Sequence, residues 1–322
     1  MLVYSSDRHT MPAMDGVLCI DKPTGITSHD VVAQSRHILN EKRVGHAGTL
    51  DPFATGLLVL LVGRATRLTQ FLTALEKEYE AIIRLGFATD TADRTGKPIS
   101  DVTGVRHWSP EQIEAALTSL RGEIDQVPPM YSAKKQGGRK LYELARKGDE
   151  VHRAPVRISI HEFEPVKPKN EWLKDNLDGT FDLEVRVVCS SGTYIRTLAE
   201  DFGKQLNVGA HLAELRRTRV GDFKIREALT LVQLKTRAAE EAVGRALHKP
   251  DDALTRLSAI DVSEEDVKRI KHGMNLQISD PKWTNGERVR VRDAAGNLIA
   301  VATFDSETRS LHPSVVLAVE DQ

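Results

Sequence analysis

The sequence has little cysteine, no long apolar segment and no surplus of basic charge. Its two cysteines, Cys19 and Cys189, form neither a CxxC pair nor a metal-ligand spacing. This argues against a disulfide framework or a zinc site and fits a reducing compartment. The longest apolar run, residues 57–62, is far shorter than a membrane span, and residues 1–16 are polar where a secretory signal is apolar. We therefore expect a cytoplasmic protein.

The formal net charge is −1, so the overall charge does not indicate a nucleic-acid-binding protein. The charge is nevertheless unevenly distributed. Eight basic residues and only three acidic ones lie in residues 134–157, here called the first basic patch. Residues 216–219, with the sequence RRTR, form a second basic patch. Such runs are usually solvated surface, but two of them also allow a local track for phosphates.

A length of 322 residues, with 40% hydrophobic and 28% charged residues, is typical of a globular chain of two domains. Strand-like patterns at residues 16–23, 77–85, 156–163 and 181–188 alternate with helical ones, and a surface loop is expected between the last two. Helices are expected after Thr27 and Ser109, the latter with a capping box, from residues 192–196 towards Leu206, and over 231–247. The pattern changes near residue 250, where a short helix and alternating strands follow. We predict an α+β (mixed α/β) fold with a tail at 1–14, a main domain at 15–249 and a smaller β-rich domain at 250–322.

The most informative stretch is GHAGTLDPFATG at residues 45–56, which sets one carboxylate, Asp51, among small residues. By itself, an Asp-Pro pair is typical of a helix start, with Asp51 as N-cap and Pro52 at the first helical position. Glycines on both sides also allow another molecule to approach the backbone closely. A carboxylate in such a loop can act as a nucleophile, a base or a metal ligand.

Four motifs occur in an order and spacing that identify a known family. They are DKPTGITS at 21–28, RVGHAGTLDP at 43–52, KEYEA at 77–81 and SSGTYIR at 190–196. With these motifs, the chain resembles the TruB family, the bacterial tRNA pseudouridine-55 synthases, over about residues 15–250. The resemblance implies a pseudouridine-synthase domain with a central, mostly antiparallel sheet flanked by helices. It also implies a C-terminal PUA-like RNA-binding domain, although residues 286–317 match that module only loosely.

The resemblance implies an isomerase that converts a uridine in the T loop of tRNA to pseudouridine, without a cofactor or metal and as a monomer. Asp51, Tyr79 and Arg196 match the family's catalytic residues: the nucleophile, an aromatic side chain that stacks on the flipped base, and the arginine that pairs with the aspartate. The positions implied to bind substrate are His46, Tyr194, Leu215, Lys22, Lys134, Lys135 and Arg139. Of these, Lys22 is also expected, with Pro23, to shape the turn beside the loop of Asp51.

Three other functions stay open at this point. A synthase of the same group could act on another RNA, because motifs around Asp51 specify chemistry better than substrate. A non-catalytic RNA-binding protein or RNA chaperone could retain the same scaffold. An aspartyl-nucleophile phosphatase is disfavoured, because Phe53 stands where such an enzyme has its second aspartate.

Overall fold

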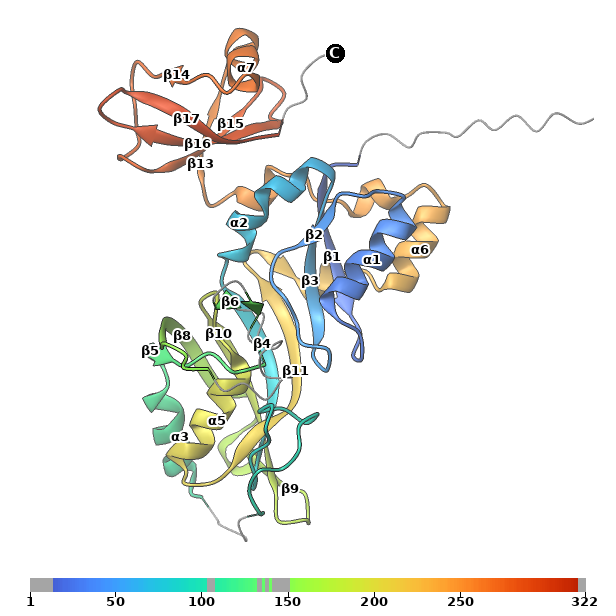
Figure 1. Ribbon diagram of the computed structural model, residues 1–322, viewed down its shortest axis with the longest axis vertical. Coiled ribbons are helices and arrows are strands. Elements are labelled where there is room, and N and C mark those ends of the chain that lie inside the picture. Colours follow the sequence, from blue (N-terminus) through green and yellow to red (C-terminus); the bar gives the residue numbers. More distant parts are fainter. Residues whose placement is uncertain (1–13, 103–107, 132–134, 137–138, 141–150, 318–322) are drawn as a thin grey trace, which may run out of the picture.

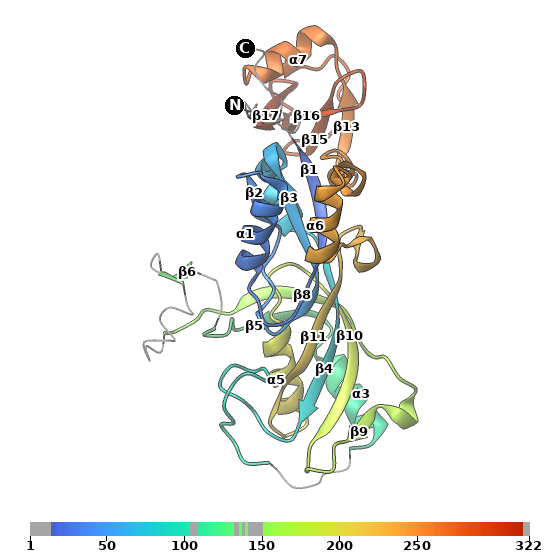
Figure 2. The same cartoon turned by 90° about the vertical axis from the view of Figure 1, so that its right-hand side faces the viewer.

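Strands dominate the computed structural model, which describes residues 14–102, 108–131, 135–136, 139–140 and 151–317. The molecule is elongated, with a large sheet below and a smaller sheet at the upper end (Figure 1, Figure 2). The α+β prediction and the mostly antiparallel central sheet are confirmed. Among the described helices, none has the length and apolar character needed to cross a membrane.

The large sheet has ten strands, seven of them in one continuous path. In spatial order these are β1 (Gly16–Lys22), β3 (Thr55–Val62), β11 (Ala210–Val220), β4 (Lys77–Leu85), β10 (Phe181–Cys189), β8 (Val156–Pro165) and β5 (Gly122–Gln126). Three short strands pair at its margins: β2 (Val44–His46), β9 (Leu173–Asp175) and β12 (Phe223–Lys224). Only the β3–β11 pair on this path is parallel. Separately, β6 (Lys135–Gln136) and β7 (Arg139–Lys140) pair with each other.

Layers of helices explain the hydrophobic patterns of the strands. β3 is buried on both faces, between α1 (Ser28–Leu39) with α6 (Leu231–Ala239) on one side and α2 (Thr69–Thr73) with the 3₁₀ turn Gly63–Leu68 on the other. This double burial explains its unbroken apolar run. β4 instead alternates, because only its Tyr79 face packs in the core beneath α3 (Pro110–Ser119) and α5 (Ile195–Gln205). The strand predicted over residues 77–85 is therefore confirmed.

Two local predictions are wrong. Asp51 and Pro52 do not begin a helix; they lie in a bend that leads directly into β3. The residues that follow are buried on both faces, so pairing with β1 and β11 satisfies their backbone better than a helix. The helix expected over 231–247 ends at Ala239, because Glu241 takes a positive φ of 54° and the chain turns back to bury Val243.

The segment expected as a surface loop after β8 also contains structure. It includes β9 and a 3₁₀ turn (Lys169–Glu171), between which Trp172 is buried. The Trp172 indole donates a hydrogen bond to the Lys167 carbonyl at 2.8 Å. A buried aromatic thus anchors this otherwise polar segment.

A second, five-stranded sheet follows the large one. Its order is β13 (Ser258–Asp261), β15 (Arg288–Arg292), β16 (Leu298–Asp305), β17 (Ser310–Val316) and β14 (Leu276–Gln277), with α7 (Glu264–Lys271) packed against it. This sheet contacts the 63–73 region of the larger body. Arg64 and Arg67 donate hydrogen bonds to the carbonyls of Leu317 and Val316, and the Arg288 guanidinium lies 5.1 Å from the Phe71 ring centre.

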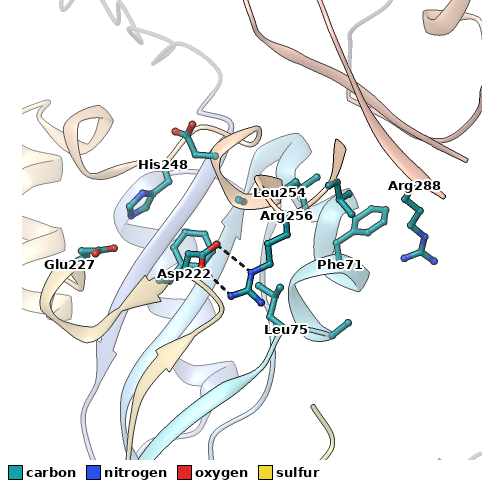
Figure 3. A pocket seen from close by; sticks show the side chains of 13 residues that line it. Phe71, Leu75, Asp222, Glu227, His248, Leu254, Arg256 and Arg288 are labelled. Carbon is teal, nitrogen blue, oxygen red and sulfur yellow. Dashed lines mark hydrogen bonds and ion pairs between the residues drawn. The ribbon is translucent and has the colours of Figure 1, made fainter. Parts of the chain in front are cut away.

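A cavity of about 300 Å³ lies at this junction (Figure 3). The Arg256–Asp222 ion pair, at 3.0 Å, runs along one wall, and His248 and Glu227 lie on the other side. Its lining residues include none of the candidate site residues named above. We therefore assign the cavity to the junction of the two bodies.

Candidate active site

Asp51 and Arg196 meet at the centre of the candidate site. Asp51 lies in the bend before β3, and Arg196 lies in the first turn of α5. The Arg196 Nε lies 2.9 Å from Asp51 Oδ2, and its Nη2 donates to Oδ1 at 3.3 Å. The Arg196 side chain is only 5% exposed, whereas Asp51 retains 34%. The geometry is a two-point fork in which a buried cation orients a carboxylate that solvent can still reach.

The Arg196 guanidinium is held in place by further acceptors. It donates to the carbonyls of Tyr131, at 2.7 Å, and Thr91, at 3.1 Å. The buried Asp93 carboxylate adds a longer ion pair, with its Oδ2 3.9 Å from Arg196 Nη1. These contacts fix the guanidinium plane independently of Asp51.

Two opposing effects set the pKa of Asp51. Burial raises this pKa above its usual range, and the Asp93 carboxylate raises it further. The Arg196 guanidinium lowers it, by its charge and by its hydrogen bond. Burial prevails and the pKa of Asp51 stays raised, while Arg196, with a smaller contribution from Lys22, favours the ionised form that a nucleophile requires.

Asp93 was missed by the sequence analysis. Its Oδ1 accepts hydrogen bonds from the Thr95 amide and hydroxyl and from the Thr91 hydroxyl. The adjoining Ala92 has φ = 59°, which is uncommon for a residue other than glycine. The signal in the sequence is the Thr-rich turn TDTADRT at 89–95, in which Asp93 and Thr95 form an Asx turn.

Tyr79 lies on β4, with its side chain buried and with Arg217 as its cross-strand partner on β11. Burial raises the pKa of Tyr79, and the Arg217 charge opposes that rise. Leu215, two residues earlier on β11, lies opposite Ala81 and packs in the same hydrophobic cluster as Tyr79. Tyr79 and Leu215 thus share one part of the core beside Asp51.

The second basic patch is not a free phosphate track, contrary to the hypothesis from the sequence. Arg217 is only 1% exposed. Its neighbours on β11 form ion pairs with acidic side chains, Arg216 with Asp21 on β1 and Arg219 with Glu76 and Glu78 at the start of β4. Of the three arginines, one is therefore buried and the other two are already paired with carboxylates.

Lys22 supports the Asp51 loop from behind. Its side chain is fully buried, and its Nζ donates to the carbonyls of Ala54, Pro23 and Pro52 at 2.6, 2.9 and 3.3 Å. Burial lowers the pKa of Lys22 to about 8. The expected role in shaping the turn agrees with this geometry, whereas a place among the substrate-binding residues does not, because no part of Lys22 is accessible.

The remaining candidates border the site on other elements. His46, on β2, is half-buried, with its ring centre 5.5 Å from that of His29 in an edge-to-face arrangement. Burial, followed by the charges of His29 and Arg217, lowers the pKa of His46. Tyr194 is the N-cap residue of α5, and the buried Gln126 side chain holds its backbone by two hydrogen bonds, at 2.8 and 3.0 Å. These contacts fix the start of the helix that carries Arg196.

Three basic candidates cannot be located in this way. Lys134 lies outside the described residues, and for Lys135 and Arg139 the structure describes only the backbone, in β6 and β7. Within the described ranges, no group of three or more His, Cys, Asp or Glu side chains is placed to hold a metal ion.

Comparisons with known proteins identify the family of this chain. The family model for the "TruB family pseudouridylate synthase (N terminal domain)" matches residues 36–195, and that for the "tRNA pseudouridylate synthase B C-terminal domain" matches residues 196–255. The chain is 48% identical to tRNA pseudouridine synthase B of Aromatoleum aromaticum over 247 residues, 77% of this chain and 76% of the relative. It is 44% identical to that of Ralstonia nicotianae over 309 residues, 93% of this chain and 94% of the relative.

A solved structure shares the fold over nearly the whole chain. It is a chain from the crystal structure of the archaeal box H/ACA sRNP Nop10-Cbf5 complex, 27% identical, with a TM-score of 0.70 over 95% of this chain and 87% of that one. Family models, full-length relatives and fold lead to the same assignment. This chain belongs to the TruB family of tRNA pseudouridine synthases.

Proposed function

We propose that this isomerase converts the uridine at position 55, in the T loop of tRNA, to pseudouridine, with Asp51 as the nucleophile. The reaction cleaves the glycosidic C–N bond, rotates the uracil and forms a C–C bond, so it needs no redox or group-transfer cofactor. The observation that carries the proposal is the pair of contacts between Asp51 and Arg196. The buried Arg196 guanidinium holds the Asp51 carboxylate in one orientation while that carboxylate remains partly accessible. Asp51 attacks either the ribose anomeric carbon or the uracil ring.

The target base reaches Asp51 only after it has been flipped out of the folded RNA loop, at an unstacking cost of a few kcal/mol. Stacking on Tyr79 offsets part of this cost, and Leu215 and Tyr194 complete the walls of the uracil pocket. His46 contacts the RNA beside the flipped nucleotide. Tyr79 also serves as the base that removes the proton from carbon 5.

Binding energy for the rest of the RNA comes from local positive charge. In this proposal Lys134, Lys135 and Arg139 contact backbone phosphates of the T stem-loop. The domain boundaries at residues 14 and 249 are part of the same proposal, with residues 250–322 as a PUA-like RNA-binding domain. The second sheet has a hydrophobic cluster of its own, which supports that division. The enzyme acts as a cytoplasmic monomer.

The test uses a T stem-loop transcript and nucleoside analysis of the product, with wild-type protein and Asp51→Asn. We expect wild-type turnover, loss of at least 1,000-fold of the rate in the variant, and RNA affinity within about threefold. Asp101→Asn, an exposed carboxylate, is the control and keeps full activity. Turnover by Asp51→Asn would refute the nucleophile. A wild-type protein that binds but never isomerises RNA would favour the RNA-chaperone alternative.

A second measurement identifies the substrate. In tRNA from cells that lack the gene, the T-loop uridine should remain unmodified. If that position is still fully converted to pseudouridine, the enzyme acts on another RNA.

A further inference from the structure

Arg217 is a buried arginine that donates hydrogen bonds to backbone carbonyls. Its Nε donates to the Leu57 carbonyl at 2.7 Å, and its two terminal nitrogens donate to the carbonyls of Gly48 and Thr49 at 3.1 and 3.4 Å. Tyr79 is the cross-strand partner of Arg217, and the nearby guanidinium opposes the rise that burial causes in the Tyr79 pKa. Taking such a charge out of water costs several kcal/mol, and the contacts of the guanidinium with these carbonyl acceptors offset that cost.

These contacts join three segments that are separate in the sequence. Gly48 and Thr49 lie in the loop that leads to Asp51, Leu57 lies in β3, and Tyr79 lies in β4. Arg217 itself projects from β11, which pairs with both of those strands. One side chain therefore fixes the loop of the proposed nucleophile and lies beside the residue proposed to face the base.

We infer that Arg217 is a positioning residue of the isomerase: it holds the Tyr79 hydroxyl and the Asp51 loop in fixed relation, so that a flipped uracil meets both. The inference rests on the proposed roles of Asp51 and Tyr79. It assigns to Arg217 no contact with RNA, because the side chain is almost completely covered.

The charges around Arg217 favour a fixed, permanently charged group at this point. Lys22 and Lys77 are buried near it, and the Arg217 charge contributes to lowering the pKa of each to about 8. The Arg217 charge also contributes to lowering the pKa of His46, and it opposes the rise that burial causes in the pKa of Cys189. A lysine in place of Arg217 would lose its proton more readily here, whereas a guanidinium stays charged at every working pH.

The test is a double-mutant cycle on the full-length enzyme, measured as the single-turnover rate on the T stem-loop with enzyme in excess. We expect Arg217→Met to lower this rate about 100-fold with RNA affinity within threefold, and Arg217→Lys to recover at least tenfold of the loss. In a Tyr79→Phe background the same Arg217→Met change should cost clearly less than in wild type, because only the hold on the Asp51 loop is then lost. Arg84→Met, which breaks an ion pair on the same sheet, is the control for general loosening and should keep the rate within threefold.

Equal losses in the two backgrounds, or a loss confined to RNA affinity, would overturn the inference. If Arg217→Met does not fold, the Arg217→Lys cycle decides by the same criterion. Phenolate absorbance near 295 nm, compared between wild type and Tyr79→Phe, tests the contact without turnover. The Tyr79 titration should move to higher pH in Arg217→Met or Arg217→Gln, and an unchanged titration contradicts the inference. If wild type modifies no RNA, the proposed function fails while this optical result still stands.

Discussion

Gly56 offers the sharpest test of how the site is built. It has φ = +100°, a conformation that favours glycine, and it pairs with Arg217 across the parallel β3–β11 contact. A Cβ placed on Gly56 would lie 2.3 Å from the Arg217 carbonyl oxygen and 2.7 Å from its amide nitrogen. These are backbone atoms of a central strand, so they cannot yield by a rotamer change.

We therefore expect Gly56→Ala to be costly for two separable reasons. The positive φ alone costs about 1–2 kcal/mol in a residue with a Cβ. Forcing the strands apart adds about 1–3 kcal/mol, the usual cost of overpacking. The free energy of unfolding should fall by roughly 2–5 kcal/mol, and the single-turnover rate should fall with it, because β11 carries Leu215 and Arg217.

Gly122→Ala is the matched control. Gly122 has φ = +82° in the same sheet, but a Cβ there meets no heavy atom within 4 Å. Urea unfolding followed by far-UV circular dichroism should give a loss of about 1–2 kcal/mol for this variant, without the overpacking cost. Equal losses for the two alanines would refute the close approach of β3 and β11 at Gly56.

Three further predictions concern charge. Burial lowers the pKa of Lys22 to about 8, so between pH 8 and 10.5 the unfolded chain holds more protons than the folded one. The free energy of unfolding should therefore rise with pH through this window, by about 3 kcal/mol from this group. Urea unfolding of Lys22→Met should lack that part of the rise, and a wild-type free energy of unfolding that falls through the window would contradict the sign. Asp93→Asn should lower the single-turnover rate about tenfold with little change in RNA affinity, because it weakens the second ion pair of Arg196; an effect on affinity alone would count against this. Filter binding at several salt concentrations should show weaker binding and a flatter salt dependence for a triple alanine variant of Lys134, Lys135 and Arg139, and an unchanged slope would make these residues ordinary solvated surface.

Periodic patterns were predictable from the sequence because they depend on neighbours along the chain. The alternation of residues 77–85 and the capping box at Ser109 both occur as expected. The Asp-Pro signal failed because β3 is buried on both faces, a fact that only the sheet order reveals. Local propensity was overridden there by tertiary pairing.

The sequence predicted those residues of the candidate site that lie in the family motifs or match its known positions. Asp51 and Arg196 were expected to pair, and their side chains meet. The family motifs named neither Asp93 nor Arg217, and RRTR looks the same in sequence whether its second arginine faces solvent or the core. Which cation is buried depends on the neighbouring strands, so the sequence alone could not separate Arg217 from Arg216 and Arg219.

The difference between buried and exposed cations also explains how a chain of net charge −1 can bind RNA, a polyanion. Around Asp51 the described side chains include four nearly covered cations, Lys22, Lys77, Arg196 and Arg217, against two carboxylates, Asp51 and Asp93. Charges in a poorly solvated interior are screened less than surface ones, so this local surplus acts strongly at the mouth of the site. The arginines and acids on the exposed parts of the sheet largely cancel, as Arg216 and Arg219 do with their acidic partners. The positive charge is therefore concentrated beside Asp51, where the proposed reaction brings the flipped nucleotide and its phosphates. Because Lys22 and Lys77 have pKa values of about 8, that charge should decrease as the pH rises above 8.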